Sequence, residues 1–288
     1  MKRNCPNSTC FSSSSTVKDG RYFRKNDSRW ITRYRCQKCG KRFSNSTFQL
    51  AYKQKKRRVN FIVYKLLCSG VSMRRIAKIV NIDRKTVKRK LIYLAQKARL
   101  SQNQYLAELS QTKLKFIQFD DLITIEHTKL KPLAVSVAID KKTRSIIGAY
   151  VAPIPAFGLL SEKSKRKYGP RQNLHKQALK RLFEKMQSIA DPLVIIESDE
   201  HKTYPEFVQR YFSQATYKTY KGHPACVVGQ GELKKLNKDP LFSINQPLAM
   251  LRDNIKRLAR RTWCTTKSPD RLQDHLDLYI DFHNRHLI

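Results

Sequence analysis

The chain has 288 residues, with 59 Lys or Arg against 22 Asp or Glu and a formal net charge of +37. This excess goes far beyond what solubility requires and predicts a polyanionic partner, with nucleic acid favoured over a membrane surface. No apolar run approaches the roughly 18 to 20 residues of a membrane span, and the first residues lack the apolar core of a signal peptide. Seven cysteines, an odd number, argue against a disulfide scaffold and predict a reducing, cytoplasmic compartment.

Residues 1–48 hold four of the cysteines and predict a small metal-binding domain, a zinc ribbon. Cys36 and Cys39 form a CxxC pair followed by glycine, the tight turn that directs two thiolates at one metal. Cys5 and Cys10 supply a second pair at the wider CxxxxC spacing. Four thiolates suit tetrahedral Zn²⁺, and a segment this small would take much of its folding free energy from the metal. The alternative is four unliganded cysteines in a mobile tail.

Residues 52–98 contain the helix-capping and turn residues that are typical of a helix-turn-helix. Ser72 is expected to cap a short helix, and a second helix is expected from about Asp83 to Ala98. Asn81 stands at the turn, where a left-handed backbone is needed. The alternative is a generic helical hairpin with a solvated basic face. The second helix is expected to expose five basic residues to DNA, Arg84, Lys85, Lys88, Arg89 and Lys90.

Residues 99–112 are interpreted as a connector, with a part-helical form left open, and the composition becomes β-rich from residue 113 onward. The β-β-β-α-β-α order that follows matches the RNase H-like plan, in which the first and fourth strands lie side by side. The predicted fold class is therefore α+β and multidomain, with an RNase H-like domain at 113–288. The expected strands span 114–119, 133–139, 145–151, 193–196 and 215–220, a basic loop spans 153–172, and helices span 173–189, 204–212, 244–262 and 269–285.

Asp120 and Asp199 each end a strand-like run, on the first and the fourth strand. If those strands are adjacent, the two carboxylates converge and repel each other unless a metal lies between them. Mg²⁺ or Mn²⁺ ions there would serve an in-line phosphoryl transfer. Asp121 points to the opposite face of the strand, so Asp120 is the preferred ligand unless a bulge reverses the two. The alternative is two acids that merely flank turns. The neighbours of the second aspartate are Glu197, Glu200 and His201.

With these residues the chain resembles bacterial insertion-sequence transposases of the DDE type. The resemblance rests on Phe119-Asp120-Asp121, on Asp199 with Tyr204, and most specifically on the run Arg252–Thr262, and it covers nearly the whole chain. It implies metal-dependent cleavage and transfer of DNA strands at the ends of the protein's own element, without a covalent protein–DNA intermediate. The implied partners are double-stranded terminal inverted repeats and target DNA in the bacterial nucleoid, met by a homo-oligomer.

The third acid of the family is replaced here by Asn245. An amide oxygen is a legitimate metal ligand but carries no charge, so Asn245 is expected to complete the site with weaker metal binding. Relatives with Asn at this position are known, and Glu197 or Glu200 are alternative ligands. The basic residues expected on the same helix are Arg252, for a phosphate near the metals, and Lys256 and Arg257, for DNA.

Two other functions stay open. The first is a DNA-binding regulator that has lost catalysis, which the replacement at Asn245 favours. The second is a serine or tyrosine recombinase with a covalent nucleophile, for which Tyr204 and Tyr279 are available. The sequence offers no arginine constellation arranged around either tyrosine.

Overall fold

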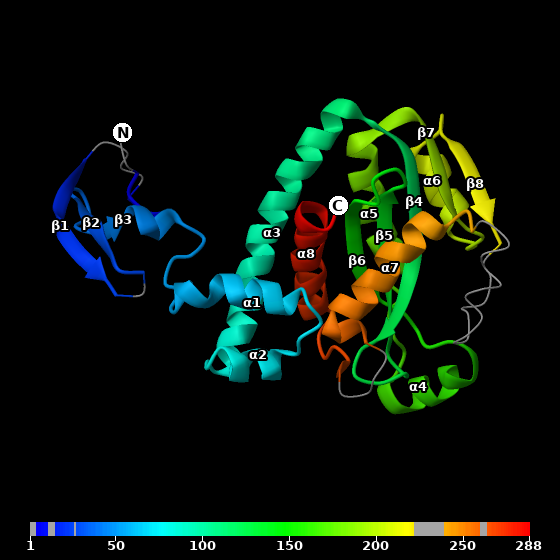
Figure 1. Cartoon of the computed structure of the whole chain (residues 1–288), viewed down its shortest axis with the longest axis horizontal. Coiled ribbons are helices and arrows are strands. Elements are labelled where there is room, and N and C mark those ends of the chain that lie inside the picture. Colours follow the sequence, from blue (N-terminus) through cyan, green and yellow to red (C-terminus); the bar gives the residue numbers. More distant parts are fainter. Residues whose placement is uncertain (1–3, 11–14, 26, 222–238, 260–263) are drawn as a thin grey trace. The chain divides into compact units, whose positions relative to one another are not determined.

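The computed structural model describes residues 4–10, 15–25, 27–221, 239–259 and 264–288 (Figure 1). The chain divides into two compact units, Met1–Val63 and Tyr64–Ile288, with the boundary inside helix α1, Asn60–Leu67. Within these residues the fold is α+β, with one sheet of three strands and one of five.

The first unit is built on an antiparallel sheet of strands β1 (Thr16–Arg24), β2 (Arg29–Cys36) and β3 (Arg42–Ser44). Tyr34 and Phe43 face each other across β2 and β3 with ring centroids 5.9 Å apart, and both are buried. A core this small gives the unit little hydrophobic stabilisation of its own. Two short 3₁₀ helices follow the sheet, η1 (Asn45–Phe48) and η2 (Arg57–Val59).

The second unit is organised by a five-stranded mixed sheet in the order β6-β5-β4-β7-β8. β4 pairs antiparallel with β5 but parallel with β7, and Gln118 lies opposite Glu197 in the parallel pair. The predicted adjacency of the first and fourth strands of this unit is therefore confirmed. The strands are β4 (Leu114–Ile125), β5 (Pro132–Asp140), β6 (Ile146–Pro153), β7 (Ala190–Asp199) and β8 (Thr216–Tyr220).

Helices α5 (His175–Ile189) and α6 (Tyr204–Tyr211) build the main hydrophobic core against the sheet. Phe119 of β4 projects into this core, with its ring centroid 5.1 Å from that of Phe183 and 4.6 Å from that of Tyr204. Successive strand residues alternate between faces, so the even-numbered residues beside Phe119 point to the opposite face of the sheet.

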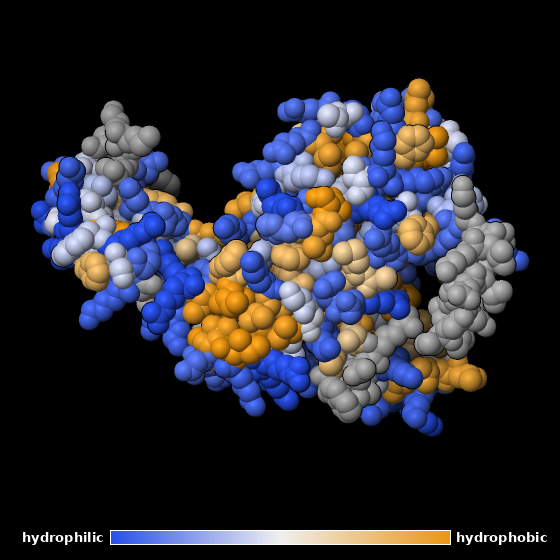
Figure 2. All heavy atoms as spheres, in the orientation of Figure 1, coloured by the Kyte–Doolittle hydropathy of each residue, from blue (hydrophilic) through white to orange (hydrophobic). Residues whose placement is uncertain are grey.

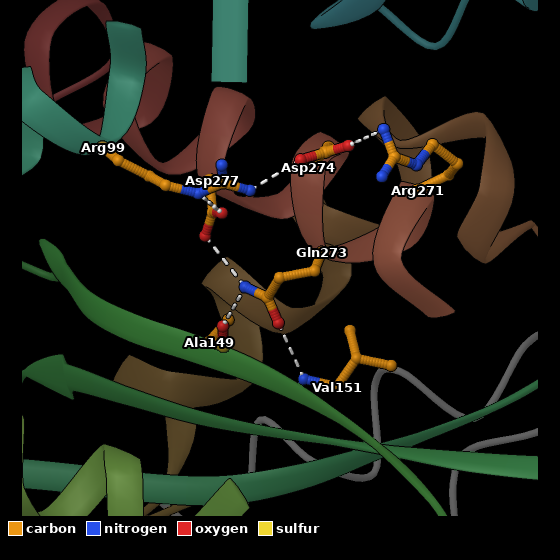
Figure 3. Close-up of polar contacts among 7 residues, drawn as sticks. All are labelled: Arg99, Ala149, Val151, Arg271, Gln273, Asp274 and Asp277. Carbon is orange, nitrogen blue, oxygen red and sulfur yellow. Dashed lines mark hydrogen bonds and ion pairs between the residues drawn. The ribbon is translucent and has the colours of Figure 1, made fainter. Parts of the chain in front are cut away.

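Helix α8 (Pro269–His286) covers the free edge of β6, which would otherwise expose unpaired backbone groups. The Gln273 side chain donates to the carbonyl of Ala149 at 2.8 Å and accepts from the amide of Val151 at 3.0 Å (Figure 3). Asn284 makes the same pair of contacts with Ile146, at 2.9 Å and 2.8 Å. Side-chain amides of one helix thus replace a sixth strand.

We expect Asn284→Ala to lower the free energy of unfolding by about 2 to 3 kcal/mol, because it leaves the buried backbone of Ile146 and the side chain of Gln102 short of partners. Urea denaturation should show a lower midpoint with an unchanged slope. The matched control is Arg285→Ala, the removal of an exposed ion pair, which should cost less than about 1 kcal/mol. Equal losses in the two variants would refute this role for α8.

Helix α3 (Arg84–Thr112) continues through residues 99–112, which the sequence analysis assigned to a connector. Gln102 and Leu106 are buried in this stretch, and Gln102 donates to the carbonyl of Ile146 at 3.0 Å. The segment has no Gly or Pro to stop the helix, and burial of one side stabilises it. The expected helix end near Ala98 was therefore wrong.

Two other element boundaries were also wrong. β4 continues to Ile125, because β5 pairs with it over that length, so Asp120 lies inside the strand rather than at its end. The segment expected to be a loop at 153–172 contains helix α4, Ser161–Tyr168. Residues 222–238, which include Cys226, lie outside the described residues.

Helix α7 (Phe242–Asn254) ends well before residue 262, where the sequence analysis placed its end. Ile255 is extended and buried, and the short helix η5 (Lys256–Leu258) follows. The carbonyl of Asn254 accepts from the amide of Gly70 at 2.8 Å. Gly70 has a φ of 68° and a Cβ there would stand 3.0 Å from a backbone oxygen, so this close approach requires glycine. Residues 260–263 lie outside the described residues.

Candidate functional site

Four cysteine thiols of the first unit converge. The Sγ atoms of Cys5, Cys10, Cys36 and Cys39 all lie within 4.8 Å of one another, with Cys5 and Cys39 at 3.5 Å and Cys10 and Cys36 at 3.8 Å. Zinc–thiolate bonds of about 2.3 Å in a tetrahedron separate the sulfur atoms by roughly 3.8 Å. The cluster could therefore hold a metal such as zinc, and the predicted convergence of both cysteine pairs is confirmed.

The backbone beside Cys39 favours the thiolate form of that residue. Gly40, with a φ of 71°, closes the turn by donating its amide to the carbonyl of Cys36 at 2.9 Å. The backbone amide of Lys41 is the main cause that lowers the pKa of Cys39 to about 6. Because the thiolate is the form that binds metal, the turn prepares this cysteine for ligation at neutral pH.

Helix α2 (Met73–Ile79) and the start of α3 form the predicted helical pair, within the second unit. Asn81 takes the left-handed conformation expected at the turn, with a φ of 51°. The side chain of Asp83 caps α3 by accepting the amide of Lys85 at 2.6 Å. Figure 2 shows hydrophilic side chains over much of the visible face of this unit.

Four of the five basic residues predicted for the DNA-facing side of α3 are exposed, and Lys90 is not. Lys90 is only 2 % exposed and lies in the same buried stripe as Val87 and Leu91. A position three residues after Val87 falls on the core side of the helix, so the prediction for Lys90 was wrong. The exposed members are Arg84, Lys85, Lys88 and Arg89.

Arg257 was expected to contact DNA, but its guanidinium is turned into the protein. It donates to the hydroxyl of Thr266 at 3.3 Å and contacts the sulfur of Met73 at 3.7 Å, and burial lowers its pKa. Its position in η5, after the end of α7, removes it from the helical face that the sequence analysis assumed. The prediction for Arg257 was wrong, while Lys256 is half-buried.

Asp120 and Asp199 occupy equivalent positions on two adjacent parallel strands. The ladder between β4 and β7 pairs Gln118 with Glu197, and their side chains contact each other at 2.7 Å. Side chains two residues further along each strand return to the same face, and these are Asp120 and Asp199. With parallel strands about 4.8 Å apart, the register brings the two carboxylates together on the face opposite Phe119.

Burial and neighbouring negative charge disfavour the ionised form of both carboxylates. Burial and the charge of Asp199 raise the pKa of Asp120 to about 7, while Arg252 opposes the shift. Burial is also the main cause that raises the pKa of Asp199. A site that disfavours two anions is stabilised by a cation, and a divalent ion with oxygen ligands fits this donor set.

Asp121 belongs to a different network, on the other face of β4. Its carboxylate accepts from the hydroxyl of Ser136 and contacts Nε2 of His175, both at 2.5 Å, and Tyr204 is a third partner. Burial would raise the pKa of Asp121, but the hydrogen bond with His175 and its companions lower it overall. A carboxylate held by three side chains anchors the strand and leaves Asp120 as the better metal ligand. Nothing in the sequence pattern indicated this role for His175.

Glu197, an alternative ligand in the sequence analysis, is held by neighbouring donors. Lys141 Nζ lies 2.7 Å from its carboxylate, Gln118 donates at 2.7 Å and the Tyr220 hydroxyl donates at 3.2 Å. These hydrogen bonds outweigh burial and lower its pKa. Glu197 thus joins β4, β7 and β8 together, whereas Glu200 is exposed.

The start of α7 is attached to the sheet beside the aspartates. The amide of Ile244 donates to the side chain of Gln118 at 3.0 Å, and the side chain of Asn245 donates to Asp239 at 2.7 Å. Arg252 lies two turns further along the helix, and its positive charge acts to lower the pKa of Asp120. Asp239 is an acid that the sequence analysis did not select; its only signal was its place before a proline at a helix start.

Tyr204 and Tyr279, the nucleophiles available to a covalent recombinase, are both fully buried. Burial is the main cause that raises the pKa of each, for Tyr279 to about 12, and Tyr279 also accepts a hydrogen bond from Asn254 at 3.1 Å. Neither hydroxyl is presented to a substrate, so this alternative loses its support.

No protein-family model matches the chain, and a search of curated proteins finds no match. Among the helices of the described residues, none has the length and apolar content that a bilayer crossing demands.

Proposed function

We propose that the protein is a DDE-type DNA transposase that cleaves and transfers DNA strands at the ends of its own insertion sequence. The observation that supports this most is the pairing of Asp120 and Asp199 on one face of two adjacent parallel strands, with the pKa of Asp120 raised to about 7. The order of the five strands is the one expected of an RNase H-like domain.

In this proposal Asp120 and Asp199 bind Mg²⁺ or Mn²⁺, and Asn245 completes the ligand set. Held by these residues, such ions would supply activation of the attacking hydroxyl and stabilisation of the leaving oxygen for in-line displacement at phosphorus. Asp239, hydrogen-bonded to Asn245, adds the negative charge that an amide lacks. Arg252 contacts the phosphate that enters beside Asp120 and so orients it for attack.

The remaining basic surface binds the DNA ends. Arg84, Lys85, Lys88 and Arg89 are exposed at the start of α3, which suits a helix that enters the major groove. A net charge of +37 makes the binding strongly salt-dependent. Chemistry at two ends of one element favours a homo-oligomer as the active assembly.

The alternative is a DNA-binding regulator derived from a transposase, without catalysis. The observation that favours it is the uncharged Asn245 at the third position. Incubation with DNA that carries the element's terminal repeats, in Mg²⁺ or Mn²⁺, distinguishes the two. A transposase nicks the DNA at the repeat ends. A regulator binds the same DNA without cleaving it, and cleavage would require a variant such as Asn245→Glu.

We expect Asp120→Asn to stabilise the metal-free protein in a pH-dependent way. The pKa of Asp120 is about 7 in the folded state against 3.8 when unfolded, so its destabilising effect grows as pH rises from about 4 to about 7 and is complete above that. The free energy of unfolding of the variant should exceed that of the wild type by on the order of 4 kcal/mol at pH 8, and this difference should be roughly 3 kcal/mol smaller at pH 5. Thermal denaturation in a chelator at both pH values measures it.

Adding Mn²⁺ at pH 8 should narrow this difference in stability. Binding to the folded state stabilises the wild type by about 2.7 kcal/mol at a hundredfold excess over Kd, and Asp120→Asn should gain almost nothing. Glu184→Gln, which removes an exposed acid from α5, is the matched control and should behave like the wild type. A variant that gains as much from Mn²⁺ as the wild type would refute the metal site.

A further inference from the structure

Two aromatic side chains stand exposed near the end of the β1–β2 hairpin. Trp30 is 68 % exposed and Phe23 is 47 % exposed. They are cross-strand partners with ring centroids 5.6 Å apart, so they form one continuous aromatic surface. Neither the cysteine cluster nor the small core of Tyr34 and Phe43 accounts for a tryptophan in solvent.

Trp30 borders a cavity of about 350 Å³. The cavity lies within the first unit, between the β2 residues Trp30, Thr32 and Tyr34 and polar residues of η1 and its C-terminal side, among them Ser46 and Gln49. This volume accommodates a nucleobase with its sugar, and its walls combine an aromatic face with hydrogen-bonding groups, as in sites of nucleobase recognition.

The charges around the cavity favour an anion. Residues 1–63 contain seventeen Lys or Arg and only two acids, Asp19 and Asp27. Asp27 accepts from Arg24 at 2.5 Å and 2.6 Å, and Asp19 lies 2.7 Å from Arg42, so both acids are paired. Arg29 is exposed and lines the cavity beside Trp30, in position for a phosphate.

We propose that this cavity binds an unpaired nucleotide of a DNA strand, with the base stacked on Trp30 and Phe23 and the phosphate held by Arg29. The inference rests on the proposed function only in taking DNA as the partner. Bases within a duplex are stacked on each other and cannot reach an aromatic side chain, so the site selects frayed or single-stranded ends. The first unit would then distinguish an open DNA end from intact duplex.

The alternative is that the aromatic pair only stabilises the hairpin, as cross-strand pairs do. That role needs neither the cavity nor the guanidinium beside it, and it predicts no preference between DNA forms. Binding of single-stranded DNA therefore separates the two explanations.

The experiment uses the full-length, zinc-loaded chain with Trp263→Phe, which leaves Trp30 as the only tryptophan. Its fluorescence is titrated with oligo(dT), with oligo(U), with a blunt duplex, and with the same duplex carrying a 3′ overhang. We expect quenching by oligo(dT) and by the overhang, and little quenching by the blunt duplex. Trp30→Ala, followed by anisotropy of labelled DNA, should weaken overhang binding roughly tenfold and blunt-duplex binding less than twofold.

Tyr52→Ala is the matched control, because Tyr52 is a similarly exposed aromatic of the same unit outside the cavity. It should leave both affinities unchanged, and zinc content should be equal in all variants. An equal loss of overhang and duplex binding in Trp30→Ala, no loss at all, or tighter binding of oligo(U) than oligo(dT) would overturn the proposal. A preference for the overhang over the blunt duplex, in a protein that shows no metal-dependent cleavage, would support this nucleotide site and contradict the proposed function.

Discussion

Asp120→Asn and Asp199→Asn should each lower the rate of metal-dependent strand cleavage at least about a thousandfold, equivalent to about 4 kcal/mol of transition-state stabilisation. Both carboxylates face the same point on adjacent strands, so loss of either removes a charge that the ions require. Binding of terminal-repeat DNA should change less than about threefold, because the exposed basic residues of α3 are untouched. Cleavage of end-labelled DNA and electrophoretic mobility shifts measure the two effects.

Two control variants separate an effect on cleavage from an effect on stability. Glu184→Gln removes an exposed acid of α5 that pairs with Lys180, and it should cleave like the wild type. Asp121→Asn tests the other face of β4, where the carboxylate holds Ser136 and His175. It should reduce stability as well as activity, whereas Asp120→Asn should reduce activity without lowering the stability of the metal-free protein. If both aspartate variants kept full cleavage, these residues would not be the catalytic pair.

Removal of the metal from the cysteine cluster should unfold the first unit while leaving the second folded. The unit has a small core, and without the cation the four cysteine side chains take up protons and no longer hold the segments together. Cys36→Ser should therefore lose stoichiometric zinc and bind terminal-repeat DNA at least about tenfold more weakly, with most of the circular dichroism signal of the larger unit retained. Zinc release assays and limited proteolysis report on the two units separately.

Cys264→Ser is the matched control for this prediction, because Cys264 is a partly exposed free thiol outside the cluster. It should bind one zinc ion and bind DNA as the wild type does. Retention of a full complement of zinc by Cys36→Ser would contradict the assignment of the four cysteines to one site.

The parts of the fold that the sequence predicted correctly are those with strong local patterns. The β-rich runs and the polar interruptions between them gave the positions of the strands along the chain, while the adjacency of the first and fourth strands was expected from the match to the RNase H-like plan. The glycine after Cys39 and the left-handed Asn81 likewise mark backbone turns that depend on residue type. Such features need no knowledge of distant contacts.

The parts that the sequence did not predict depend on tertiary packing. Lys90 carries a charge but lies on the core side of α3. Which side of the helix is buried depends on the surface that packs against it, and the sequence alone does not give that surface. α3 passes through the assumed connector because Gln102 finds a backbone partner on β6. α7 stops at Asn254 because its carbonyl meets Gly70, almost two hundred residues earlier in the chain.

The contacts around Asp120 and Asp199 were equally hidden. His175 and Asp121 are 54 residues apart in sequence, and no motif connects them. Lys141 neutralises Glu197 across two strands, which removed an acid from the list of alternative ligands. Asp239 was not predicted, because its role depends on its hydrogen bond with Asn245, six residues further on. Pairwise contacts of this kind require coordinates.

Direct measurement of divalent ion binding tests the central claim. Zinc-loaded protein is titrated with Mn²⁺ at pH 8, and free Mn²⁺ is followed by electron paramagnetic resonance, in the wild type, Asp120→Asn, Asp199→Asn and the double variant. Because both carboxylates serve one site, each single variant should bind Mn²⁺ at least about tenfold more weakly, and the double variant should lose little more than either. Wild-type affinity in both single variants, or independent and additive losses, would contradict a shared metal site at Asp120 and Asp199.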